Sequence, residues 1–111
     1  MLTIDVVLDS DGLLQACGIS GHANAGPKGA DIVCAAVSIL ARTALKTLSG
    51  KKGIVVQGKA PKRGAFSMEV RYTEDATAFV SGVTEFLLEG FGSISKEYPD
   101  HCMVHITTER R

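Results

Sequence analysis

The chain begins with a regular alternation of apolar and polar residues, which runs from Leu2 to Leu8. A hydrophobic period of two is typical of a β-strand with one buried face and one exposed face. The residues from Asp9 to Gly12 favour a tight turn, and an apolar pattern returns from Leu13 to Ile19. The first part of the chain therefore predicts a β-hairpin.

Three further segments have the composition of strands. Two of them are Ile54 to Ala60 and Phe66 to Tyr72, and the turn-forming run from Pro61 to Gly64 between them predicts a second hairpin. The last strand is expected from His101 to Thr108, after Pro99. Together with the first hairpin, these segments predict a five-stranded sheet.

Two segments change to the period of an α-helix. The first runs from Ile32 to Ser49, with Asp31 as a plausible N-cap and Gly50 in the position of a C-terminal glycine. The second runs roughly from Asp75 to Glu97, and a kink or a break is possible near Gly90. Its predicted apolar face consists of Phe79, Val83, Phe86, Leu87, Phe91 and Ile94.

The predicted order of elements is β-β-α-β-β-α-β. Because two helices cannot cover both faces of a five-stranded sheet well, the simplest arrangement places both helices on one face. We therefore expect a single α+β domain over residues 1–111, built as a two-layer sandwich. The other face of the sheet would be exposed or buried in a dimer.

Composition narrows the class of protein. Lys and Arg balance Asp and Glu at 12 each, and this zero net charge argues against a dedicated nucleic-acid binder. The sequence contains no apolar run of the length that crosses a membrane, and its first residues lack the pattern of a signal peptide. We therefore expect a cytoplasmic protein.

The 3 cysteines, Cys17, Cys34 and Cys102, are an odd number, which argues against a disulfide framework. None belongs to a CxxC pair, so a structural zinc site is not expected. His101 and His105 are spaced for one face of the last strand, but Cys102 alternates to the other face and a third metal ligand is missing. The sequence predicts no metal and no cofactor.

The most specific chemistry lies between Gly21 and Leu40, in the run GHANAGPKGADIVCAAVSIL. With Asp31 as the cap, Cys34 falls in the first turn of the helix, where unpaired N–H groups and the helix dipole favour a thiolate. The same N–H groups could hold an oxyanion. His22 can accept the thiol proton, because imidazole titrates near neutral pH and the intervening glycines permit close approach.

Two neighbours of this pair have alternative roles. Ser38 lies one helical turn after Cys34 and could hydrogen-bond the thiolate or the histidine, or only the carbonyl of Cys34. Asp31 could orient His22 instead of capping the helix. A cysteine in an apolar helix is also often a buried packing residue, so the residues alone leave both interpretations of Cys34 open.

The run GHA…G.DIVCAAVS, from Gly21 to Ser38, resembles the signature of the ribosomal-processing cysteine protease family, called Prp. Chain length and element order also resemble this family, so the resemblance covers essentially the whole chain. It implies a catalytic dyad of His22 as base and Cys34 as nucleophile, supported by Gly21, Asp31 and Ser38. It also implies a homodimer whose substrate is the precursor of the large-subunit ribosomal protein numbered twenty-seven, from which an N-terminal extension is removed.

The loop within this run, from Ala23 to Ala30, departs from the family in detail. Gly26, Pro27 and Gly29 are expected to let it act as a lid that closes over a bound peptide. Basic residues in the second predicted hairpin could mark transient contact with the ribosome, although such charge runs usually face solvent. The alternatives to a protease are a non-catalytic ribosome-associated binding module and a thiol redox sensor built on Cys34.

Overall fold

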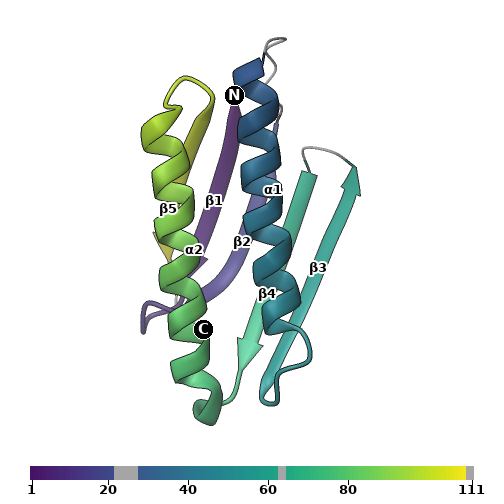
Figure 1. Ribbon diagram of the computed structural model, residues 1–111. Coiled ribbons are helices and arrows are strands. Elements are labelled where there is room, and N and C mark those ends of the chain that lie inside the picture. Colours follow the sequence, from purple (N-terminus) through teal and green to yellow (C-terminus); the bar gives the residue numbers. More distant parts are fainter. Residues whose placement is uncertain (22–27, 63–64, 110–111) are drawn as a thin grey trace.

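The computed structural model describes residues 1–21, 28–62 and 65–109, and for residues 28–31 and 61–62 it describes the backbone alone. Within these residues, strands and helices follow each other in the predicted order (Figure 1). They are β1 (Leu2–Leu8), β2 (Leu14–Ser20), α1 (Lys28–Leu48), β3 (Ile54–Lys62), β4 (Ala65–Tyr72), the short 3-10 helix η1 (Glu74–Ala76), α2 (Thr77–Glu97) and β5 (Cys102–Thr108).

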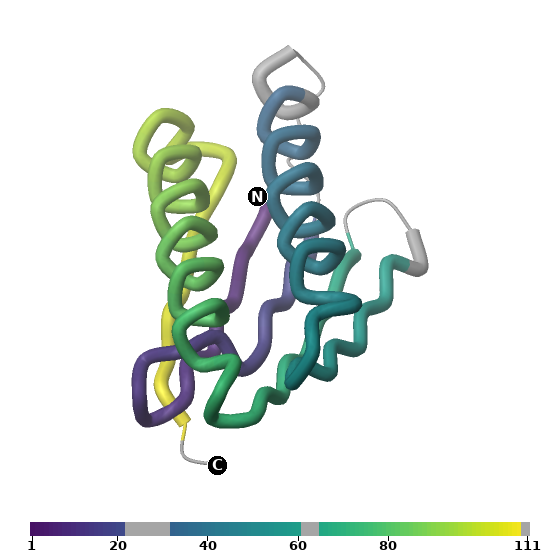
Figure 2. Tube along the Cα trace, turned by 60° about the horizontal axis from the view of Figure 1, so that its bottom comes forward, coloured from purple at the N-terminus to yellow at the C-terminus, as the bar shows by residue number. Residues whose placement is uncertain are grey.

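The strands form one five-stranded sheet in the order β3-β4-β2-β1-β5. Neighbouring strands are antiparallel except β1 and β5, which run parallel. Both helices lie on the same face of this sheet, with α1 toward β3 and α2 over β5 (Figures 1 and 2). The predicted α+β class and its two-layer arrangement are confirmed.

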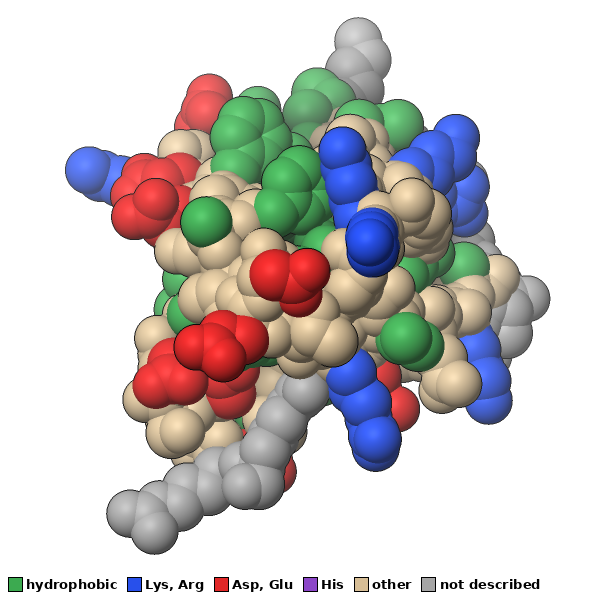
Figure 3. Space-filling view, turned by 90° about the horizontal axis from the view of Figure 1, so that it is seen from below, with side chains coloured by type: hydrophobic (Ala, Val, Ile, Leu, Met, Phe, Trp, Pro, Cys, Tyr) green, Lys and Arg blue, Asp and Glu red, His purple; other side chains and the backbone are tan. Residues whose placement is uncertain are grey.

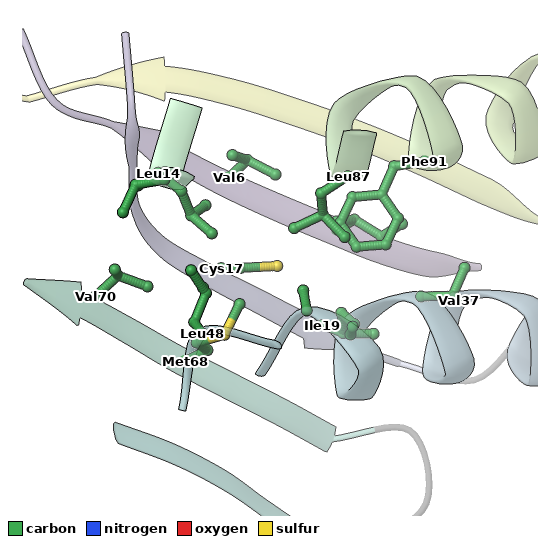
Figure 4. Close-up of a cluster of buried hydrophobic side chains, with 14 of the residues drawn as sticks. Val6, Leu14, Cys17, Ile19, Val37, Leu48, Met68, Val70, Leu87 and Phe91 are labelled. Atoms are coloured by element: carbon green, nitrogen blue, oxygen red, sulfur yellow. The ribbon is translucent and has the colours of Figure 1, made fainter. Parts of the chain in front are cut away.

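The core lies between the two layers and is built on the strand residues that point toward the helices. Leu2, Ile4 and Val6 of β1 are each at most 1% exposed. Leu87 and Phe91 of α2 meet them from the helix layer, as Figure 4 shows for the labelled side chains. The alternation at the start of the chain therefore predicted the inward face of β1 correctly.

The buried face of α2 differs from the one predicted. Phe79 and Phe86, which we expected in the core, are 36% and 71% exposed, and Val80 and Thr84 are buried instead. The Thr84 hydroxyl donates to the carbonyl of Val80 at 2.7 Å and accepts from the N–H of Leu14 at 3.0 Å. Because both hydrogen bonds form inside the protein, α2 can turn this polar residue inward without leaving its hydroxyl unpaired.

The α2 helix runs without a break through Gly90, so the break that the sequence allowed there does not form. A Cβ atom at position 90 would lie 2.7 Å from Cδ1 of Leu40 on α1, which is closer than side chains pack. The glycine therefore allows α1 and α2 to approach each other at this point.

The α1 helix begins at Lys28, before the predicted start at Ile32. Asp31 consequently lies inside the helix, and the prediction that it is the N-cap is wrong. The helix dipole also favours an acidic residue in the first turn, so an aspartate near a helix start fits either position.

Candidate active site

Cys34 lies in the second turn of α1, because the helix begins at Lys28. The prediction that this thiol occupies the first turn is therefore wrong. Unpaired N–H groups belong to the first residues of a helix, and the dipole acts most strongly in the same place. The backbone around Cys34 thus does not supply the free N–H groups that we expected to hold an oxyanion.

The Cys34 side chain is half-buried and lines a cleft of about 510 Å³. Ser38 and Arg42 line the same wall from the following turns of α1. The facing wall comes from the sheet, and its residues are Leu2, Ile19, Ala60, Ala65 and Phe66. The helix therefore places a thiol, a hydroxyl and a guanidinium group along one side of a groove whose other described lining residues are apolar.

Ser38 is exposed in the cleft one helical turn after Cys34, as the spacing predicted. Within the part of the chain that the structure describes, its hydroxyl has no hydrogen-bond partner. Thr47 and Ser49 behave differently, because each hydroxyl donates to a carbonyl one turn earlier at 2.7 Å. The interpretation of Ser38 as a residue that only bonds back to the helix is therefore not supported.

The chain leaves β2 beside this cleft, which is lined by Ile19. Gly21 follows with φ +90°, and a Cβ atom there would lie 2.5 Å from the carbonyl oxygen of Met1. Only glycine combines this left-handed backbone with so close an approach. Gly21 therefore fixes the direction of the chain immediately before His22 in the sequence.

The remaining residues of the predicted site are described in part or not at all. His22, Gly26 and Pro27 lie outside the described residues, and Gly29 and Asp31 are described by their backbone alone. The dyad, the lid and the orienting role of Asp31 therefore stay predictions. The described residues on either side do meet at one cleft, since Ile19 and Cys34 both line it.

The other two cysteines are buried in the core. Cys17 and Cys102 are both 2% exposed. Burial, with a smaller contribution from the Asp5 carboxylate, raises the pKa of the Cys17 thiol to about 12. Burial also raises the pKa of the Cys102 thiol, and the nearby Cys34 thiol adds to this rise. Neither buried thiol ionises at neutral pH, so Cys34 is the cysteine suited to nucleophilic chemistry.

In the last strand Cys102 is buried and His105 is exposed, as predicted, but the strand begins at Cys102, so His101 precedes it. Over residues 1–21, 28–62 and 65–109, no group of three or more His, Cys, Asp or Glu side chains is placed to hold a metal ion. In the same part of the chain, no helix combines the length and the apolarity that are needed to cross a membrane.

The profile of a family described as cysteine protease Prp matches residues 1–103. The chain belongs to the Prp family. It is therefore a cysteine protease, as predicted, and the interpretation as a non-catalytic binding module is not supported. The half-buried thiol of Cys34 in a cleft agrees with the activity of the Prp family.

Solved structures share the Prp fold. The crystal structure of SMU.848 from Streptococcus mutans is 25% identical with a TM-score of 0.81, and the match covers 98% of this chain and 96% of that one. The essential ribosomal processing protease Prp from S. aureus, in complex with a substrate peptide, is 20% identical with a TM-score of 0.78, over 96% of this chain and 99% of that one. Its complex with a covalently linked product peptide is 21% identical with a TM-score of 0.77 over the same shares, 96% and 99%. None of the curated proteins compared with the chain matches it.

Proposed function

We propose that this chain is a processing endopeptidase that removes the N-terminal extension of a large-subunit ribosomal protein precursor, the bacterial protein numbered twenty-seven. The observation that carries the proposal is the half-buried thiol of Cys34 in the wall of an apolar cleft of about 510 Å³. The S. aureus protease of the same fold is called a ribosomal processing protease and binds a substrate peptide, which supports the choice of substrate.

In the proposed reaction, His22 removes the proton from Sγ of Cys34 and the thiolate attacks the scissile carbonyl carbon. The C–N bond breaks as His22 returns the proton to the leaving amine, and the N-terminal fragment remains on Cys34 as a thioester. His22 then takes a proton from water, and the resulting hydroxide hydrolyses the thioester and frees the thiol. No metal or cofactor takes part in these steps.

The position of Cys34 in α1 changes where the oxyanion is stabilised. The N–H groups around Cys34 are engaged within the helix and are not available as donors. The Ser38 hydroxyl lies in the same cleft and has no partner among the described residues. We therefore assign Ser38 as a donor to the thiolate or to the oxyanion, in place of the first-turn N–H groups.

The test is cleavage of a synthetic precursor peptide, with the fragments identified by mass spectrometry. We expect two fragments from the wild type, none from Cys34→Ala, and cleavage slower by about 100-fold or more from His22→Ala, because a general base typically contributes that much. Cys102→Ala is the matched control, since it removes a thiol that does not line the cleft. Equal cleavage by the wild type and Cys34→Ala would rule out Cys34 as the nucleophile.

We further propose that residues 1–111 act as one domain in the cytoplasm, where ribosomal precursors are made, as a homodimer with transient ribosome contact. A second copy would cover apolar surface, since Phe79 is 36% and Phe86 71% exposed. Sedimentation equilibrium measures the mass directly, and twice the chain mass of 11.7 kDa is expected. A mass of one chain at micromolar concentration would contradict the dimer.

A further inference from the structure

Among the described residues that line the cleft, Arg42 carries the only charge. It follows Cys34 by eight positions on α1, and its side chain is exposed. In the part of the chain that the structure describes, no carboxylate pairs with it. A guanidinium group has five N–H donors and no acceptor, so the side chain offers an unused anion-binding group to whatever occupies the groove.

The surroundings of Arg42 in the sequence are also basic. Glu69 is the only acidic residue between Arg42 and Arg71, a span that includes the end of α1, all of β3 and most of β4. Figure 3 looks at the molecule from below. Most of the Lys and Arg side chains in this view lie toward the α1 side, and most of the acidic side chains lie toward the α2 side. A protein with zero net charge therefore has a basic side, which attracts anionic peptides more than cationic ones.

We propose that Arg42 pairs with an acidic side chain of the substrate, so that the substrate class is an extended peptide with Asp or Glu about four residues from the scissile bond. The inference rests on the proposed function, because Cys34 marks the scissile bond. Eight helical positions span about 12 Å along α1. An extended peptide advances about 3.3 Å per residue, so about four residues cover the same distance. The planar guanidinium group of Arg42 can bond both oxygens of the carboxylate.

Solvent and salt limit the size of the effect, because Arg42 is exposed. We expect kcat/KM for a peptide with Asp at the matching position to exceed that of its Asn counterpart about fivefold at low ionic strength. The ratio should fall toward one as salt is added. A larger KM with an unchanged kcat is expected for the Asn peptide if the pair forms equally in the bound substrate and in the transition state.

The test is an aspartate scan of a cleavable peptide, with Asn at each position as the neutral reference. We expect one position, about four residues from the cut, at which the wild type prefers Asp and Arg42→Glu prefers Lys. Lys46→Glu is the matched control, because it makes the same charge change one turn farther along α1, at a residue that does not line the cleft. An Asp preference that is the same in the wild type and Arg42→Glu, or an equal loss in Arg42→Glu and Lys46→Glu, overturns the proposal.

A binding measurement separates this proposal from the protease assignment. Fluorescently labelled Asp and Asn peptides are titrated into Cys34→Ala and into the double variant with Arg42→Glu, and anisotropy reports the Kd. Tighter binding of the Asp peptide that disappears with Arg42→Glu supports the pairing even where no peptide is cleaved. Equal binding of both peptides by Cys34→Ala overturns the pairing even where the wild type cleaves them. Thermal melting confirms that each variant is folded.

Discussion

The two helices have the same length, 21 residues each, but the grooves that they border differ in chemistry. Where α2 lies over the sheet, its inward residues Leu87 and Phe91 are at most 1% exposed. The α1 helix also packs inward, with Val33 and Val37, but its other flank borders the cleft, where Cys34 is half-buried. The thiol therefore lies in an open groove along α1, where a peptide can reach it, whereas the groove along α2 is lined by the rings of Phe79 and Phe86.

The largest effect that distinguishes the open groove from the closed core is thiol reactivity. We expect iodoacetamide at about pH 7.5 to modify Cys34 at least about a thousandfold faster than Cys17 in the folded protein. Burial raises the pKa of Cys17 to about 12, so almost none of it is thiolate at that pH. Mass spectrometry of digested samples measures the rates. In denatured protein all three thiols should react alike, and equal rates in the folded protein would show that Cys17 is not enclosed.

The next largest effect is on stability, and it should differ between the buried side and the exposed side of α2. Phe91→Ala removes a ring that is 0% exposed and should lower the free energy of unfolding by about 3–5 kcal/mol. Phe86→Ala removes a ring that is 71% exposed and should change it by less than about 0.5 kcal/mol in the isolated chain. Urea unfolding followed by circular dichroism measures both. A large loss in Phe86→Ala at low protein concentration would mean that α2 is rotated relative to the structure.

The strands were predictable because a pleated strand imposes its period on neighbouring residues, as in Leu2, Ile4 and Val6. The buried face of α2 was not, since apolar residues occur on more than one side of that helix and hydrophobicity alone does not choose between them. The choice depends on Thr84, whose hydroxyl accepts from the N–H of Leu14, 70 positions away in the sequence. A hydrogen bond over that separation leaves no local signal.

The candidate site was also predictable only in part. The helical spacing of Cys34 and Ser38 placed both side chains on one flank of α1, and the structure has them in one cleft. Arg42 gave no such signal, because a basic residue on a helix usually faces solvent. Its place in the cleft depends on the sheet, where Phe66 of β4 lies in the facing wall. The local sequence indicates the thiol and its neighbour, and tertiary structure adds the charge.

The raised pKa of Cys17 also makes the stability of the core depend on pH. Burial raises this pKa from 9.0 to about 12 in the folded protein. Between these values the unfolded chain has lost the thiol proton while the folded chain keeps it, so the stability that depends on Cys17 is complete below about pH 9 and falls as the pH rises toward 12. One such group contributes a slope of up to about 1.4 kcal/mol per pH unit.

Urea unfolding between about pH 8 and 10 should show a shallower decline in the free energy of unfolding for Cys17→Ala than for the wild type. Equal declines would contradict the burial of this thiol.

The smallest effect concerns the point where the two helices meet. Gly82→Ala places a Cβ with nothing within 4 Å, so it should stabilise the protein by up to about 1 kcal/mol through helix propensity. Gly90→Ala places a Cβ 2.7 Å from Leu40, so displacement of that side chain should offset the same gain. Adding Leu40→Ala should restore the gain from Gly90→Ala, which a double-mutant cycle measures as coupling between positions 40 and 90. If Gly90→Ala alone stabilises the protein as much as Gly82→Ala, then α1 is not held against α2 at this contact. In that case the packing of the two helices does not fix the position of the groove beside Cys34.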